Sequence, residues 1–105
     1  MTRQEQLEVY RGMLKTDNRW AGRALTVLWE RQTAGEQAAW VTTEHNAQGF
    51  SAWDAELGSS LAVQLRDHGW LTERQWRAAH RMLPKYAGQM MAVAAERAAI
   101  KSEGV

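Results

Sequence analysis

The residues best suited to a chemical task in this sequence are four cations close to residue 80. On a helix with 100° per residue, Arg81 and Lys85 fall within about 20° of Arg74, and Arg77 lies about 60° to one side. Cations at this spacing can contact successive phosphate groups, and neighbouring aromatic rings can stack on unpaired bases. The pattern therefore predicts a basic ridge that binds nucleic acid. The alternative is a solvated helix face whose cations pair with nearby acidic side chains.

Aromatic residues accompany this ridge in the sequence. A core built from 105 residues has difficulty burying all six tryptophans, so we expect one or two to be exposed. Trp40, Trp53 and Trp70 lie next to predicted loops, whereas Trp76 has a core-like position. Trp53, Trp70 and Tyr86 are therefore the rings that we include in the candidate binding site. For each ring the alternative is that it holds its own loop on the core.

Acidic residues concentrate elsewhere. The 13 basic and 12 acidic residues give a net charge of +1, so no global field favours nucleic acid or membrane. Residues 32–65 nevertheless contain no Lys or Arg, and carry Glu36, Glu44, Asp54 and Glu56. This segment could contact a basic partner protein, or Asp54 and Glu56 could simply stabilise the start of a helix.

The sequence predicts no catalytic site, no metal site and no cofactor. The residue types of a metal hydrolase occur at Glu44, His45, Asp54, His68 and His80. Their spacing matches none of the metal-binding motifs, and no nucleophile elbow or glycine-rich phosphate loop is present. We therefore expect a protein that is not an enzyme.

Helical periodicity and capping signals predict the elements that must position the ridge. Capping boxes occur at Thr2, Thr33 and Thr72, and a similar pattern starts at Ser51. With the apolar periodicity they predict helices over about residues 3–14, 19–31, 34–41, 51–68, 72–83 and 86–100.

Breaks between these helices are equally clear. Residues 42–51 form the longest predicted loop, Gly69 suits a left-handed helix end, and Pro84 must interrupt or kink the chain. The small residues Gly58, Ser59 and Ser60 should let another helix approach closely, within the monomer or in a dimer. Of these two possibilities we expect the monomer.

The fold class follows from this organisation. We predict an all-α protein, a compact bundle of five to six short helices in orthogonal or mixed packing, with a single domain over residues 1–100 and a frayed tail over 101–105. The chain lacks cysteine, a membrane-length apolar run and a signal-peptide pattern. These absences indicate a cytoplasmic protein without membrane contact.

Five segments together resemble a known group of sequences. QTAGEQAA, NAQGF, DAELGSSLAVQL, GWLTERQW and LPKYAGQM are similar to segments in a family of small, mostly uncharacterised proteins of phages, plasmids and integrative elements. Similar segments also occur attached to helicase-like DNA-processing proteins. The resemblance covers about residues 10–95, and Ala47 stands where family members tend to have a second loop glycine.

The resemblance implies a mobile-element origin and a non-catalytic accessory role, and two hypotheses follow. In the first, the module binds DNA or RNA, single-stranded or together with a helicase, through the basic ridge and its rings. In the second, it is a phage anti-defence protein, similar to anti-CRISPR proteins in size and origin. It would then inhibit a host nucleoprotein effector through exposed tryptophans and charged faces.

Overall fold

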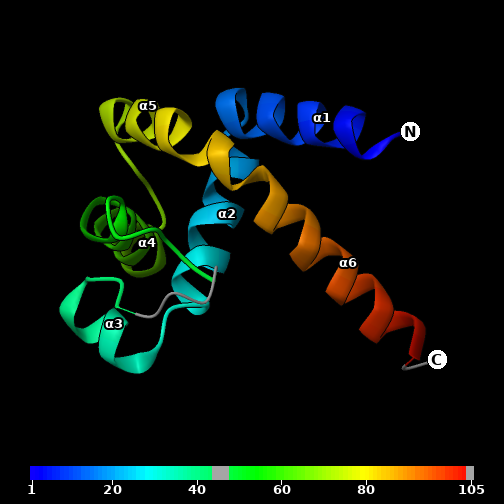
Figure 1. Ribbon diagram of the computed structural model, residues 1–105. Coiled ribbons are helices and arrows are strands. Elements are labelled where there is room, and N and C mark those ends of the chain that lie inside the picture. Colours follow the sequence, from blue (N-terminus) through cyan, green and yellow to red (C-terminus); the bar gives the residue numbers. More distant parts are fainter. Residues whose placement is uncertain (44–47, 104–105) are drawn as a thin grey trace.

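The structure, a computed structural model, describes residues 1–43 and 48–103 and confirms the predicted all-α class. Six α-helices and one 3-10 helix follow one another, and no strand occurs in these two ranges. The elements are α1 (Arg3–Thr16), α2 (Asn18–Glu30), α3 (Ala34–Ala39), α4 (Ala55–His68), α5 (Glu73–Met82), η1 (Leu83–Tyr86) and α6 (Ala87–Glu103). Their arrangement is shown in Figure 1.

Side-chain caps determine where most of the helices begin. The three predicted capping boxes are present, because the hydroxyls of Thr2, Thr33 and Thr72 each accept the backbone N–H three residues later. Asp17 is the N-cap residue of α2, and its carboxylate accepts the Arg19 backbone N–H at 2.8 Å. That hydrogen bond lowers the pKa of the Asp17 carboxyl below its usual value.

The start of α4 differs from the expectation. The sequence predicted a cap formed by Ser51 with Asp54 in the first turn, but the helix begins at Ala55 and Asp54 is its N-cap residue without a side-chain cap. The Asp54 carboxylate instead contacts Tyr86 and Lys85. The Ser51 hydroxyl still contacts the same carboxylate at 3.2 Å, so a local and a tertiary contact meet at Asp54 although neither caps the helix.

Helix ends follow the predicted signals in two places and differ in two others. Gly69 ends α4 at φ 78°, and Pro84 lies in η1, which separates α5 from α6. Trp40, predicted inside a helix, is the left-handed C-cap of α3 at φ 55°. The chain stays helical through residues 101–103, where the sequence predicted a frayed tail.

The central element is α2, which packs against α1, α4, α5 and η1. One face of α2 supplies Ala21, Ala24, Leu25 and Leu28, all at most 1% exposed. The other elements complete the core around this helix with Leu14, Phe50, Leu61, Ala79, Leu83 and Val93, among others. Burial of this apolar surface is the main stabilising contribution to the fold.

Small residues of α4 bring the loop segment close to the helix, within one chain. A Cβ atom added to Gly58 would lie 2.4 Å from Cε1 of the buried Phe50 ring, and Ser59 is fully buried. The sequence predicted that another helix would approach at these small residues, whereas the neighbour at Gly58 is the Phe50 ring of the preceding loop segment in the same chain. Leu57, the neighbour of Gly58 on α4, is 45% exposed.

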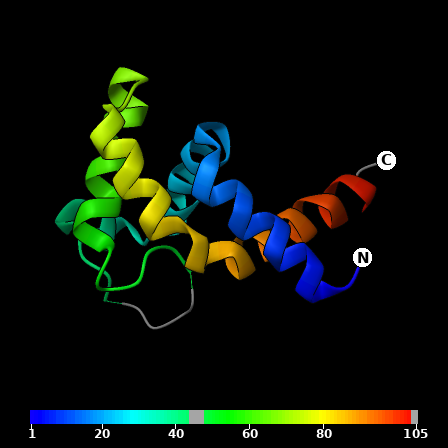
Figure 2. The same ribbon diagram turned by 90° about the horizontal axis from the view of Figure 1, so that it is seen from above.

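Both termini lie on the same side of the molecule, away from α3 and α4, as Figures 1 and 2 show. The first half of α6 packs on α1 and η1, while every residue from Ala94 to Ser102 is exposed. No helix in the described ranges has both the length and the apolar character needed to cross a membrane.

Candidate nucleic-acid interface

Three of the four predicted ridge cations lie together on the exposed side of α5. Arg74, Arg77 and Arg81 are exposed, while the opposite side of the helix buries Ala79 and Met82. The amphipathic character of this ten-residue helix therefore fixes the direction of the cations.

Acidic neighbours neutralise only part of this charge. Arg77 pairs with Glu73 at 3.5 Å, and both side chains are mostly exposed, so the pair contributes little stability. Arg74 and Arg81 make no ion pair with any residue in the described ranges. The α5 ridge, defined here as Arg74, Arg77 and Arg81, thus presents net positive charge to solvent.

A cation from another helix joins the α5 ridge. Lys15, in the last turn of α1, lines a shallow surface depression together with Arg77, Arg81, His80 and Pro84. The sequence analysis missed Lys15 because its position depends on the packing of α1 against α5. A basic residue in a last helical turn has a local explanation in the helix dipole, so no sequence signal pointed to this site.

His80 connects the ridge to the junction of α1 and α2. Its Nδ1 lies 2.7 Å from the Leu14 carbonyl oxygen, and its Nε2 lies 2.7 Å from Oδ1 of Asn18. A neutral imidazole donates only one hydrogen bond. Two acceptors therefore require either the protonated ring or an Asn18 amide turned to present its NH2 group. In either case His80 positions α5 against the other two helices.

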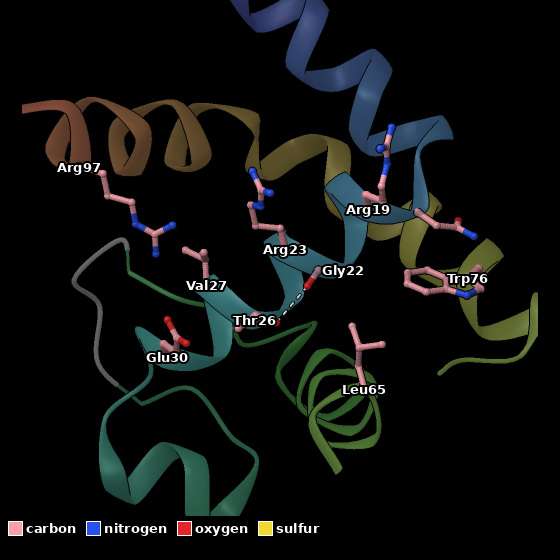
Figure 3. A pocket seen from close by; sticks show the side chains of 10 residues that line it. Arg19, Gly22, Arg23, Thr26, Val27, Glu30, Leu65, Trp76 and Arg97 are labelled. Carbon is pink, nitrogen blue, oxygen red and sulfur yellow. Dashed lines mark hydrogen bonds between the residues drawn. The ribbon is translucent and has the colours of Figure 1, made fainter. Parts of the chain in front are cut away.

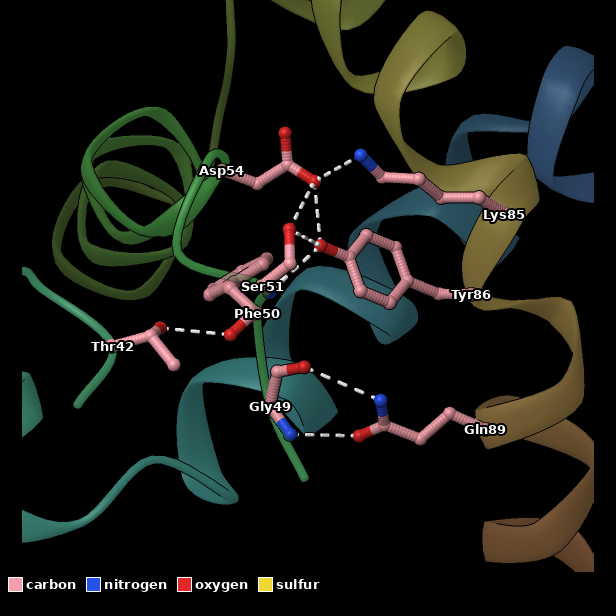
Figure 4. Close-up of polar contacts among 8 residues, drawn as sticks. All are labelled: Thr42, Gly49, Phe50, Ser51, Asp54, Lys85, Tyr86 and Gln89. Carbon is pink, nitrogen blue, oxygen red and sulfur yellow. Dashed lines mark hydrogen bonds and ion pairs between the residues drawn. The ribbon is translucent and has the colours of Figure 1, made fainter. Parts of the chain in front are cut away.

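The fourth predicted ridge cation, Lys85, and the candidate ring Tyr86 both make contacts within the protein, and the burial of Tyr86 corrects the prediction that its ring is available for binding. The Lys85 Nζ lies 2.6 Å from Oδ2 of Asp54, and Tyr86 donates its hydroxyl proton to the same oxygen at 2.5 Å (Figure 4). Tyr86 is only 7% exposed, so its ring cannot stack on a base. Burial, and then the hydrogen bond to Asp54, raise the pKa of Tyr86 to about 12.

These contacts fix the end of the long loop. The Tyr86 hydroxyl accepts the Ser51 backbone N–H at 2.9 Å, and Gln89 bonds both the N–H and the carbonyl of Gly49, at 2.8 and 3.2 Å (Figure 4). From the other side, the buried Gln32 accepts the Phe50 N–H at 3.1 Å. The sequence predicted a loop over residues 42–51, and these hydrogen bonds hold its described C-terminal end against α6 and the residues that follow α2. The remaining positions, Glu44, His45, Asn46 and Ala47, lie outside the described residues.

The candidate tryptophans have the predicted exposure. Trp53 is 94% exposed and Trp70 is 57% exposed, which confirms that one or two rings lie outside the core. Trp70 lies two residues before the N-cap of α5, and Trp53 is next in the chain to Asp54, the partner of Lys85. One exposed indole therefore precedes α5 in the chain, and the other belongs to the residue before Asp54, which pairs with Lys85 of η1.

Comparison with known proteins adds nothing to this geometry, because the chain matches no family model, no curated protein and no solved structure. The resemblance to mobile-element proteins stays a prediction. Within the described ranges, no three His, Asp or Glu side chains form a group that could hold a metal ion.

Proposed function

We propose that this protein is a non-catalytic module that binds nucleic acid through the α5 ridge. The observation that carries the proposal is the exposure of the Arg74 and Arg81 guanidinium groups, which have no ion-pair partner among the described residues, beside the basic depression that Lys15 joins. Guanidinium groups release counterions from phosphates and bind phosphate oxygens in a bidentate geometry. The role fits an accessory protein of a mobile element, acting in the cytoplasm of a host cell, alone or with a helicase.

Aromatic neighbours favour an unpaired strand over a duplex. The Trp70 indole is exposed immediately before α5, where a base could stack on it while phosphates contact the ridge. Base–aromatic stacking contributes about 1–3 kcal/mol per base and tolerates any sequence. The proposed activity is therefore binding without strong sequence specificity.

The test is a titration of labelled single-stranded and duplex oligonucleotides at two salt concentrations. We expect single-strand binding that weakens as salt rises, and an affinity at least tenfold lower for Arg74→Ala combined with Arg81→Ala. The control is Arg3→Ala with Lys101→Ala, two exposed cations near the chain termini whose removal changes the net charge equally. Absence of binding at low salt, or equal losses in both double variants, would rule out the ridge as the site.

A protein target is the second candidate, and one observation specifically favours it. Trp53 is 94% exposed and Leu57, four residues later, is 45% exposed, so two large apolar side chains face solvent at the start of α4. Exposed indoles are frequent anchors at protein interfaces. This surface suits the anti-defence hypothesis, in which the module inhibits a host nucleoprotein effector.

A pull-down from nuclease-treated host lysate separates the two candidates. The anti-defence hypothesis requires a stoichiometric partner that is lost with Trp53→Ala and retained with Trp70→Ala. Recovery of material that disappears on nuclease treatment would instead favour the nucleic-acid function.

A further inference from the structure

A second basic surface lies across α2, where this helix faces α6 on one side and α5 on the other. Arg19 and Arg23 project from successive turns of α2, and Arg97 reaches the same recess from α6 (Figure 3). Trp76 and Leu65 line the side of the recess that faces α5 and α4 (Figure 3). We call this concave surface the α2 recess. It combines cations at its edge with an indole inside it.

The charge of the α2 recess is positive. Arg23 and Arg97 make no ion pair with any described residue. Arg19 pairs with Asp17 at 3.5 Å, but 91% of its side chain is exposed, so this pair is weak and screened by solvent. The lining includes one carboxylate, Glu30. Three guanidinium groups to one carboxylate make the recess a local site for an anion, although the whole chain is almost neutral.

The α2 recess and the depression on α5 are joined by a hydrogen-bonded pair of residues, one from each surface. Asn18 lines the recess and His80 lines the depression, and their side chains lie 2.7 Å apart. Trp76, inside the recess, stacks on the His80 ring with centroids 6.3 Å apart and planes at 30°. The two concave surfaces are therefore neighbours across the Asn18–His80 pair.

We propose that the α2 recess and the α5 depression form one track for a single-stranded nucleic acid, running from Arg97 across Asn18 and His80 to Arg81. This inference rests on the proposed nucleic-acid function and adds the path of the strand and a second set of cations. None of these cations, Arg19, Arg23 and Arg97, belongs to the α5 ridge.

The dimensions favour a short single strand. At about 1.5 Å per residue, the part of α2 that lines the recess is about 18 Å long and the ridge on α5 is about 10 Å long. Together they could contact on the order of 4–8 nucleotides, within the range of known single-strand sites. A duplex is stiff over this length and keeps its bases stacked inside. A single strand can instead follow two successive recesses and place a base on Trp76.

The experiment measures binding of labelled thymidine oligonucleotides, a tetranucleotide and a dodecanucleotide, at several salt concentrations. The test variant is Arg23→Gln with Arg97→Gln, and the control is Arg3→Gln with Arg66→Gln, which removes the same charge from positions that line neither concave surface. We expect the test variant to bind the dodecanucleotide about tenfold more weakly. The slope of log affinity against log salt should fall by about 1.4, since each phosphate contact on a single strand contributes about 0.7.

The tetranucleotide shows whether the track is used along its length. It can be held by the α5 ridge alone, so we expect its affinity to change less than threefold in the test variant. Arg97→Gln alone, on the exposed half of α6, provides a second variant if the double substitution lowers the melting temperature.

Each contrary result has a distinct meaning. If no oligonucleotide binds, the proposed function and the track both fail. If dodecanucleotide binding depends on Arg74 and Arg81 but is unchanged by Arg23→Gln with Arg97→Gln, only the track fails. Tighter binding of a matched duplex would overturn the single-strand assignment. Displacement by polyglutamate at equal charge concentration would show that the recess selects an acidic protein surface.

Discussion

At the scale of single residues, the Asp54 carboxylate combines a local contact, to the Ser51 hydroxyl, with contacts to a distant segment. It accepts a hydrogen bond from the Tyr86 hydroxyl and pairs with the Lys85 ammonium group, and so joins the start of α4 to η1. A charge-assisted hydrogen bond of this kind is stronger than one between neutral groups. The same residues that the sequence assigned to a binding surface therefore stabilise the loop that precedes α4.

The raised pKa of Tyr86 predicts how stability depends on alkaline pH. The folded state holds the phenol proton up to a pKa of about 12, whereas the unfolded chain releases it near 10.0. The folded state thus binds more protons between these values, and the free energy of unfolding falls as pH rises from about 10 to about 12. We expect a loss of roughly 1–2 kcal/mol from this group.

Chemical denaturation at several alkaline pH values, for the wild type and Tyr86→Phe, isolates this contribution. The Phe variant should be less stable by about 1–2 kcal/mol at neutral pH, and the difference should shrink as pH approaches 12. A difference that stays constant over this range would mean that the hydroxyl does not titrate as described.

Gly58 gives a second prediction at residue scale, with a matched control in the same chain. An added Cβ would lie 2.4 Å from a fully buried Phe50 ring, so Gly58→Ala should destabilise the fold by about 1–3 kcal/mol. Gly12, inside α1, has no atom within 4 Å of such a Cβ, so Gly12→Ala should stabilise by about 0.5–1 kcal/mol. Thermal melts measure both. Equal effects of the two substitutions would contradict the packing described for Phe50.

At the scale of elements, the helices were predictable and their partners were not. The Thr–Glu or Thr–Gln pairs at Thr2, Thr33 and Thr72 predict helix starts, because a capping box forms between two residues that are three positions apart in the sequence. Gly69 and Pro84 likewise end or interrupt a helix through the conformation of their own backbone. Such signals depend only on neighbouring residues, so they predict helix boundaries without knowledge of the fold.

The parts that sequence analysis missed depend on contacts between distant segments. Lys15 joins the ridge only because α1 packs on α5, and Arg97 lines the same recess as Arg23 although α6 and α2 are far apart in the sequence. Tyr86 looked like a surface ring because periodicity does not show which side of η1 the loop covers.

The α6 helix predicts an uneven distribution of stability. Its buried residues end at Val93, and the exposed half beyond it is tied to the rest by the Arg31–Glu96 ion pair at 2.6 Å. Deletion of residues 98–105 should therefore change the free energy of unfolding by less than about 0.5 kcal/mol. Val93→Ala should cost about 1–3 kcal/mol because it leaves a cavity between α6 and the core.

Urea denaturation of the two variants checks this expectation, and hydrogen exchange should show faster exchange beyond Ala94 than in α2. If the deletion destabilises as much as Val93→Ala, the outer half of α6 contributes to the folded core in a way that its exposure does not show.

At the scale of the whole molecule, the distribution of apolar surface decides the oligomeric state. The small residues that could have formed a symmetric helix contact are occupied, since Gly58 lies under Phe50 and Ser59 is fully buried. The exposed large apolar side chains of the described residues are distributed over the chain, at Met1, Val9, Val41, Trp53, Leu57, Trp70 and Ile100. A stable dimer generally needs a contiguous contact of about 800 Å² per partner, more than isolated side chains supply.

We therefore expect a monomer with the chain mass of 11.9 kDa in light scattering, at concentrations up to about 100 times those used for binding. A mass near twice this value would contradict the expectation, and two variants would then locate the contact. Loss of the dimer with Trp53→Ser would assign it to α4, and loss with Ile100→Ser would assign it to the exposed half of α6. The answer also bears on binding, because a dimer through α6 would bring two Arg97 side chains, and hence two α2 recesses, close to one another.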